Sequence, residues 1–294
     1  MGMTAPVGTW LFPMGLVVML LLDRLAGETA LLLALAAGVA VLGLPHGALD
    51  PEVARQRLGV RGFARSAIFL LGYLALGLAA LLPWWHWPTL ALSVFLLYSA
   101  WHFGEDTGER LGVAGALGYG LLVVFLPLAL QPAASAAVLA YLAPGGPGPL
   151  FHGAGWLCAA GAALLVLGLC RADRPQPSDW RDPLLLLLGA WLLAPLAYFV
   201  AYFCFLHSPR HLLETARALG LHDWPSRLRA TAPATLATWA LAGLALPWLL
   251  QQSAESAVLQ MVFIGLAALT VPHMVLESLA APRRGSSPEG QSGC

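Results

Sequence analysis

Histidines near the ends of apolar segments are the residues of this sequence best suited to chemistry. Eight histidines occur, and five lie at, or just inside, the end of an apolar segment. Imidazole nitrogens bind Fe, Zn, Cu or Ni, and the four cysteines form no CxxC pair, so thiolate ligands are not expected. The pattern therefore indicates a metal site built from imidazoles. The five are His46, His102, His207, His211 and His273.

A carboxylate stands three or four residues after four of these histidines. Residues at that spacing share one face of a helix. A metal-bound imidazole usually donates its second N–H to a carboxylate or carbonyl, which fixes the orientation of the ring. We therefore expect the acids to lie beside the site as local partners of the histidines. The pairs are His46 with Asp50, His102 with Asp106, His211 with Glu214, and His273 with Glu277.

His207 and His211 form an HxxxH pair, which would place both rings on one helix face, where they could share a metal. Ser208 and Pro209 could instead be the N-cap and first residue of a helix, which would leave His207 just before it. Either geometry brings the two rings close together.

The alternative for any single histidine is an ordinary place at the membrane interface. His86, between Trp85 and Trp87, is typical of an interfacial aromatic belt. His152 and His222 have no motif and are not assigned a role. The acids could likewise be ordinary boundary charges. Five histidines with repeated acid spacing favour a shared site over these separate explanations.

The segments that carry the histidines are long and apolar. The chain is 59% hydrophobic and 10% charged, against roughly 25% charged in ordinary soluble domains. A membrane-spanning helix needs about 20 largely apolar residues. Its net charge of zero implies no nucleic-acid partner. Stretches without Asp, Glu, Lys or Arg cover residues 1–22, 29–49, 66–104, 111–170, 183–209, 230–254 and 256–276.

These stretches predict an all-α, polytopic membrane helix bundle. Residues 66–104 are broken by PWWHWP at 83–88, and residues 111–170 by PGGPGP at 144–149, so each contains at least two spans. The expected total is about nine spans, within a range of 8–10. Residues 1–281 would form a single membrane-embedded catalytic domain. Residues 282–294 would be a disordered tail.

Arginine clusters indicate which ends of the spans face the cytoplasm. They follow the second, sixth and seventh spans, around Arg55, Arg171 and Arg210. The positive-inside rule places all three on the cytoplasmic side. The third conflicts with the others if the seventh segment crosses as one span. Either that segment does not cross fully, or residues 111–170 hold a third span, or Arg210 and Arg217 lie inside the protein.

Four motifs together resemble the Brp/Blh family of membrane β-carotene 15,15′-dioxygenases. They occur in the family's order and spacing, and they spread over nearly the whole chain. The resemblance implies a non-haem Fe(II) enzyme that cleaves the central double bond of β-carotene with O2 to give two retinals. The motifs are PHGALD at 45–50, WHFGED at 101–106, HSPRH at 207–211 and PH at 272–273.

The same resemblance implies that His46, His102, His207 and His211 bind the iron. His273 would lie near the site or shape the approach of the substrate. Because ligands from the second, fourth and seventh spans must meet, we expect them well inside the bilayer, with Arg210, Glu214 and Arg217 buried and paired. Aromatic side chains around the motifs could line an apolar slot for the polyene. They include Tyr98, Trp101, Phe103, Tyr202 and Phe203.

The expected location is the inner membrane of a bacterium, where the bilayer would supply the carotenoid and a rhodopsin could accept the retinal. Other readings stay open. A membrane metal or solute transporter could use the histidines as a transit site, and an oxygenase could act on another carotenoid or lipid. A di-iron desaturase would need more HxxxH-type boxes than the one that is present.

Overall fold

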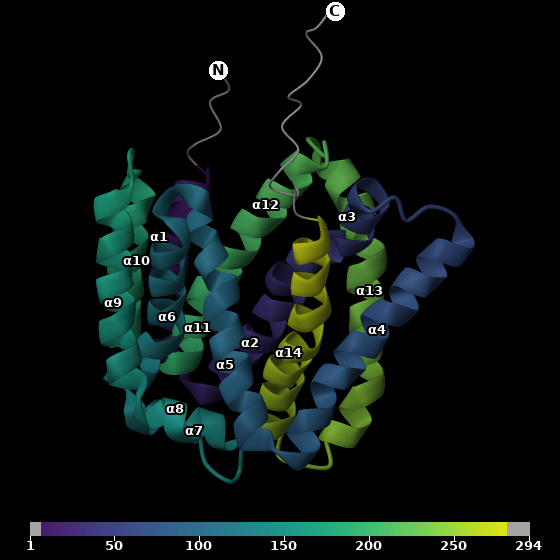
Figure 1. The fold of residues 1–294 in the computed structure, drawn as a ribbon. Coiled ribbons are helices and arrows are strands. Elements are labelled where there is room, and N and C mark those ends of the chain that lie inside the picture. Colours follow the sequence, from purple (N-terminus) through teal and green to yellow (C-terminus); the bar gives the residue numbers. More distant parts are fainter. Residues whose placement is uncertain (1–6, 281–294) are drawn as a thin grey trace, which may run out of the picture.

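A computed structural model describes residues 7–280, and these form a bundle of helices (Figure 1). Long helices run along the height of the bundle, while the short helices α7 and α8 lie across one end. The predicted all-α fold is confirmed. The predicted tail at 282–294 lies outside the described residues. The helices are α1 Val7–Leu25, α2 Gly27–Gly38, α3 Asp50–Arg57, α4 Phe63–His86, α5 Pro88–Gly104, α6 Gly112–Leu130, α7 Pro132–Ala140, α8 Pro149–His152, α9 Ala154–Arg171, α10 Pro177–Leu192, α11 Pro195–Tyr202, α12 Ser208–Ala218, α13 Trp224–Leu249 and α14 Ala254–Ala280.

Within the described residues, 6 helical segments are long and apolar enough to cross a membrane. The prediction of a polytopic membrane protein is confirmed. The predicted count of about nine spans also included the segments that become α1, α5 and α10, which run beside these helices (Figure 1). The six are Gly27–Arg57 (α2 to α3), Phe63–His86 (α4), Gly112–Leu130 (α6), Ala154–Arg171 (α9), Trp224–Leu249 (α13) and Ala254–Ala280 (α14).

Apolar side chains cover the outside of the bundle, as expected for a surface that faces lipid. Helix α4 has no buried residue, and α13 buries only Thr231 and Thr235. Backbone hydrogen bonds within each helix satisfy the polar groups that lipid cannot. Helix α6, in contrast, is buried along most of its length between Gly115 and Leu128. The outer helices thus provide the lipid-facing surface, and α6 lies in the core.

A break within residues 183–209, the seventh predicted span, resolves the conflict between the positions of the arginine clusters. Helix α10 ends at Leu192, and α11 begins at Pro195. Proline is tolerated in the first turn of a helix because its missing N–H would have no partner there. The Asp23 carboxylate accepts a hydrogen bond from the N–H of Ala194 at 3.0 Å, which holds the turn. Residues 183–209 are therefore not a single span.

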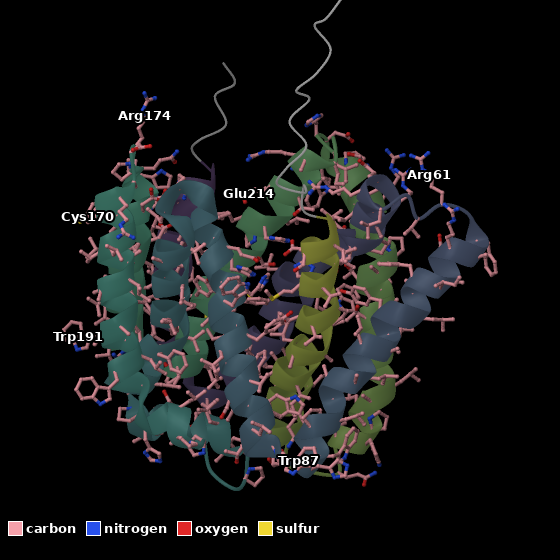
Figure 2. The ribbon with its side chains drawn as sticks, in the orientation of Figure 1. Arg61, Trp87, Cys170, Arg174, Trp191 and Glu214 are labelled. Atoms are coloured by element: carbon pink, nitrogen blue, oxygen red, sulfur yellow. The ribbon has the colours of Figure 1, made fainter. Side chains whose placement is uncertain are left out.

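After this break, the chain reverses direction. Helix α10 runs away from the end that carries Arg61 and Arg174, whereas α11 and α12 return toward it (Figures 1 and 2). The HSPRH motif therefore approaches the same end as the other arginine clusters. Between α6 and α9, residues 111–170 hold only the short helices α7 and α8, so this part of the chain contains no third span.

Two π-helical turns meet next to the HSPRH motif. The turns are η1 Val39–Gly43, after α2, and η4 Phe203–His207, between α11 and α12. The Ser208 hydroxyl donates to the carbonyl of Gly43 at 2.8 Å. A Cβ atom on Gly43 would lie 2.7 Å from Cε1 of Phe203, so glycine permits this close approach. π-Turns are often found at functional sites, where they reorient side chains.

The HSPRH motif is helical throughout. His207 ends η4, and the chain continues directly into α12, where Pro209 occupies the first turn. Since the Ser208 hydroxyl bonds to η1, it does not cap α12. The sequence alternative in which His207 lies before the helix is therefore wrong. The rings of His207 and His211 are stacked, with centroids 6.2 Å apart.

Candidate metal centre

Four histidines from three parts of the bundle come together. His102 lies in the last turn of α5, His207 and His211 bracket the start of α12, and His273 lies on α14. The ring centroid of His102 is 4.9 Å from that of His207, 5.4 Å from that of His273 and 6.2 Å from that of His211. The rings of His211 and His273 are 5.2 Å apart. Tertiary structure thus gathers motifs separated by up to 171 residues, from 102 to 273, into one cluster.

The fifth histidine of the motifs, His46, lies in the 3-10 helix η2 Leu44–Leu49. Its side chain is outside the part of the structure that is described. The backbone of η2 passes close to the cluster, because a Cβ atom on Gly47 would lie 4.0 Å from Nδ1 of His273. The assignment of His46 as a ligand therefore stays a prediction.

Burial of the cluster is uneven. His102 and His273 are each 3% exposed and His207 is 1% exposed, whereas the His211 side chain is 17% exposed. Aromatic rings cover the buried side: Phe103 packs edge-on to His207 at 4.8 Å, and Phe203 stacks on it at 5.6 Å. The site thus has a dry side against the core and a more open side at His211.

Each of these four histidines has a carboxylate partner, but in most cases it is not the predicted one. Asp106 pairs with His207, and Asp50 pairs with His273, across the bundle. The spacing along the chain predicts Asp106 for His102, and it predicts Asp50 for His46, whose side chain lies outside the described part of the structure. The distances are 3.0 Å for His207 Nδ1 to Asp106, 2.8 Å for His273 Nδ1 to Asp50, 3.1 Å for His211 Nε2 to Glu277, and 3.2 Å for His102 Nδ1 to Glu105.

Local 3-10 geometry explains why Glu105, and not the predicted Asp106, lies beside His102. Residues four apart share a face of an α-helix, but a 3-10 helix has three residues per turn. The chain is 3-10 helical in η2, which contains His46, and in η3 Glu105–Leu111, which follows His102. The residue three positions on, Glu105, therefore partners His102. Asp106 is turned toward His207 instead.

Glu214 does not occupy the predicted place. It is exposed on α12, and so is Arg217, so the expectation that both are buried and paired is wrong. The carboxylate that contacts His211 is Glu277 of α14, and the same oxygen lies 3.6 Å from Nε2 of His273. The spacing between His273 and Glu277 was therefore informative, although Glu277 lies closer to His211.

Two tyrosine hydroxyls also bond to the buried aspartates. The Tyr202 hydroxyl donates to Oδ2 of Asp106 at 2.6 Å, and the Tyr73 hydroxyl donates to Oδ2 of Asp50 at 2.7 Å. Asp106 thus has one oxygen on His207 and the other on Tyr202, whereas in Asp50 the oxygen that accepts from Tyr73 also lies 3.0 Å from His273 Nδ1. Carboxylates of this kind fix the tautomer and orientation of metal-binding imidazoles. Tyr73 was not predicted, and no sequence motif marks it.

A partly buried ion-pair network continues outward from Asp106. Arg210 donates to the Asp106 backbone carbonyl at 3.1 Å and to Asp182 at 2.7 Å. Arg181 donates to the other oxygen of Asp182 at 2.7 and 2.9 Å. The expectation that Arg210 is paired inside the protein agrees with these bonds. Asp182, just before an apolar stretch, was not predicted. Charged residues within membrane segments are costly and usually functional, and this rule could have drawn attention to it.

An apolar groove adjoins the dry side of the cluster. Its walls come from α5, α6, α11 and α14, and α7 closes the end farthest from the histidines. His102 and Phe103 are part of its wall, as are Tyr202 and Phe203. Tyr98 and Trp101 do not line it, and Trp101 is 52% exposed on the outer side of α5. Of the aromatic residues that were predicted to line a slot, the groove therefore brings three together.

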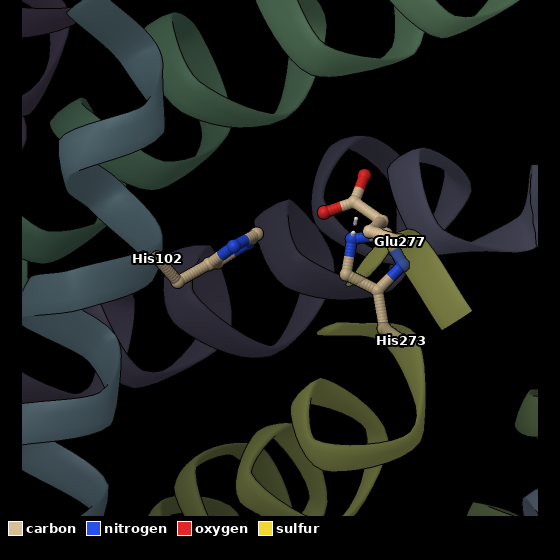
Figure 3. A group of neighbouring side chains, drawn as sticks. All are labelled: His102, His273 and Glu277. Carbon is tan, nitrogen blue, oxygen red and sulfur yellow. Dashed lines mark ion pairs between the residues drawn. The ribbon is translucent and has the colours of Figure 1, made fainter. Parts of the chain in front are cut away.

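The donor atoms of the cluster suit a metal ion. One ligand atom each from His102, His273 and Glu277 lie within 4.8 Å of one another (Figure 3). Two metal–ligand bonds of about 2.1 Å span a distance of that order. The imidazoles converge, and carboxylates hold the outer nitrogens of His207 and His273. The residues present therefore fit a bound metal.

A membrane-spanning helix bundle with a histidine-rich centre beside an apolar groove defines a class of integral membrane metalloproteins. The family described as beta-carotene 15,15'-dioxygenase matches residues 37–280. This range contains all four motifs and every histidine of the cluster. The chain belongs to the β-carotene 15,15′-dioxygenase family.

Curated relatives agree with this assignment. The chain is 33% identical over 257 residues to a beta-carotene 15,15'-dioxygenase of uncultured marine bacterium 66A03, covering 81% of this chain and 90% of the relative. It is 30% identical over 292 residues to a probable beta-carotene 15,15'-dioxygenase Blh of Halobacterium salinarum, covering 82% of each chain. No solved structure matches the chain significantly.

Proposed function

We propose that this protein cleaves the central 15,15′ double bond of β-carotene with O2 and releases two molecules of retinal. The observation that carries this proposal is the contact between the histidine cluster and the apolar groove. His102 belongs to both, so a hydrocarbon chain in the groove would lie against the cluster. Membership of the family supports the same reaction.

The metal in this proposal is ferrous iron. Its proposed ligands are His46, His102, His207 and His211, the set that the motifs indicate. When bound, iron would supply the site at which O2 is activated beside the polyene. Asp106 and Tyr202 would hold His207 in one orientation, because their hydrogen bonds restrain its ring. A preorganised set of imidazoles needs little rearrangement when the metal binds.

The groove would position the polyene and keep water away. Its polar groups are few, and several are paired within the protein: the Tyr198 hydroxyl donates to the Val123 carbonyl, and the Ser135 hydroxyl donates to the Pro127 carbonyl. A hydrocarbon would not cost these groups their partners on its arrival. Holding one bond of a long polyene beside the cluster is the main positional requirement of the reaction.

The lipid bilayer would supply this substrate, since carotenoids partition into hydrocarbon. The proposed location is the inner membrane of a bacterial cell, with the end that carries Arg61 and Arg174 in the cytoplasm. Retinal would leave into the same bilayer, where an acceptor such as a rhodopsin could take it up.

The test is expression of the chain in bacteria that accumulate β-carotene. The expected result is bleaching of the cells with stoichiometric appearance of retinal, two per carotenoid lost. A matched culture that expresses His222→Ala should behave as the wild type, because His222 lies in the connection between α12 and α13, outside the cluster. Well-folded, iron-loaded protein that leaves β-carotene intact would overturn the proposal. Metal accumulation by the cells without bleaching would favour a transporter.

A further inference from the structure

We propose that His273 is itself a metal ligand, so that the C-terminal helix α14 completes the metal-binding shell. The inference rests on the proposed metal centre and goes beyond the four histidines assigned to it. It is carried by the position of His273, by its hydrogen bonds and by the likeness of its surroundings to those of His207.

Position places His273 among the proposed ligands rather than behind them. Its ring forms a triangle with those of His102 and His211, at 5.4 and 5.2 Å from them, while those two rings are 6.2 Å apart. Both distances from His273 are within the range of the other ring pairs in the cluster, from 4.9 to 6.2 Å. In Figure 3, His273 and His102 approach from opposite helices, with Glu277 beside them. A residue that only shaped the substrate path would have no need of this placement.

Hydrogen bonding determines which nitrogen of His273 would face the metal. Nδ1 bonds to both carboxylate oxygens of Asp50, at 2.8 and 3.0 Å. With Nδ1 protonated and donating to Asp50, Nε2 carries the lone pair that a metal takes up. A ligand atom of His273 lies within 4.8 Å of ligand atoms of His102 and Glu277. The orientation is thus that of a carboxylate-backed metal ligand.

The surroundings of His273 repeat those of His207. Both rings are almost fully buried, and both bond through Nδ1 to a buried aspartate. Both aspartates also accept a hydrogen bond from a tyrosine hydroxyl, Asp106 from Tyr202 and Asp50 from Tyr73. Burying a histidine and an aspartate together costs free energy of desolvation. Ionisable residues within membrane segments are therefore usually functional. The properties that mark His207 as a ligand therefore mark His273 equally.

His273 would add a fifth imidazole to the four that the motifs assign to the iron. The Glu277 carboxylate would lie beside the metal, because one of its oxygens is 3.1 Å from Nε2 of His211 and 3.6 Å from Nε2 of His273.

The experiment measures iron binding, independently of cleavage. Purified His273→Ala is expected to bind Fe(II) at least about 100-fold more weakly than the wild type, and free imidazole should restore part of the binding. Asp50→Asn should weaken binding about 10-fold, in line with losses seen when a ligand's carboxylate partner is removed. Tyr73→Phe should have a smaller effect in the same direction.

The matched control is Met274→Ala, which removes a buried neighbour of His273 on the same helix without removing a nitrogen ligand. It should retain wild-type iron affinity if the protein folds. Should His273→Ala fail to fold, His273→Gln and the Co(II) absorption spectrum of Asp50→Asn provide the same comparison. His273→Ala with unchanged iron affinity and a wild-type spectrum would overturn the inference.

Failure of this inference is distinguishable from failure of the proposed reaction. Wild-type protein that binds iron through His273 but does not cleave β-carotene would contradict the reaction alone. Protein that cleaves β-carotene while His273→Ala keeps its iron would contradict the inference alone. In that case His273 would act on the approach of the substrate.

Discussion

Two similar arrangements hold the metal centre from opposite sides, and they differ in what supports them. On one side, His207, Asp106 and Tyr202 lie in the core, where Tyr202 is 1% exposed. On the other, His273 and Asp50 are backed by Tyr73, which is only partly buried on α4, a helix with no buried residue. The hydrogen bonds are alike, but core packing supports one set and a peripheral helix supports the other.

This difference indicates how the Asp106 side and the Asp50 side of the metal centre would respond to substitution. Asp106 is also tied through its backbone to Arg210 and thereby to Asp182, so its position is fixed by several elements at once. Asp50 depends on its place at the start of α3 and on Tyr73. We therefore expect the Asp106 side to be the more rigid and the more costly to disturb. The predictions below test this in order of decreasing effect.

The largest effect is expected from His207→Ala. This change removes a ring that contacts His102, Phe103 and Phe203, and it leaves the Asp106 carboxylate buried without its imidazole partner. Iron binding and retinal formation should both be abolished. Metal analysis of the purified protein and retinal extraction from β-carotene-producing cells measure the two outcomes. Full iron content and activity in this variant would show that His207 is not a ligand.

Asp106→Asn should weaken iron binding more than Asp50→Asn does. We expect losses of about 100-fold and about 10-fold, at the two ends of the range for partners of metal ligands. The reason is that His207 and Tyr202, which bond to Asp106, are packed in the core and have less room to adjust than Tyr73 on the peripheral helix α4. Metal titration of both variants gives the comparison directly. Equal losses would mean that peripheral support on α4 holds its aspartate as firmly as the core does.

Asp182→Asn tests whether the outer ion pairs stabilise the Asp106 side. Removing the negative charge of Asp182 should lower iron affinity several-fold. Arg210 would lose its charged partner and keep its bond to the Asp106 carbonyl. Asp179→Asn is the matched control: Asp179 is equally buried on α10 and pairs with Arg110, which has no contact with Asp106 in the described network. Similar losses in both variants would indicate general destabilisation of α10 rather than an effect on the metal centre.

The smallest effect is expected from Glu105→Gln. The Glu105 side chain is 48% exposed, whereas those of Asp106 and Asp50 are each 5% exposed. An exposed ion pair is screened and contributes little. Iron affinity should fall by less than about threefold in a titration at moderate salt. A loss as large as that of Asp106→Asn would mean that carboxylates on the open side matter as much as those in the core.

The sequence by itself determined the class of protein and most of the centre. Long stretches without charge require helices in lipid, since only helices satisfy the backbone there within a single segment. Histidines in such stretches are rare enough to indicate a site, and the structure gathers four of the five that were singled out. These conclusions depend on composition and residue type, which the chain carries before it folds.

Tertiary structure alone decided which acid serves which histidine. The local rule paired residues three or four apart, and 3-10 turns at η2 and η3 changed the faces on which those residues lie. Asp106 therefore reaches His207 and Asp50 reaches His273, over separations of 101 and 223 residues. For the same reason, the sequence did not predict the roles of Tyr73 and Asp182. A hydrogen bond across the bundle depends on how helices pack, and spacing along one helix carries no information about that.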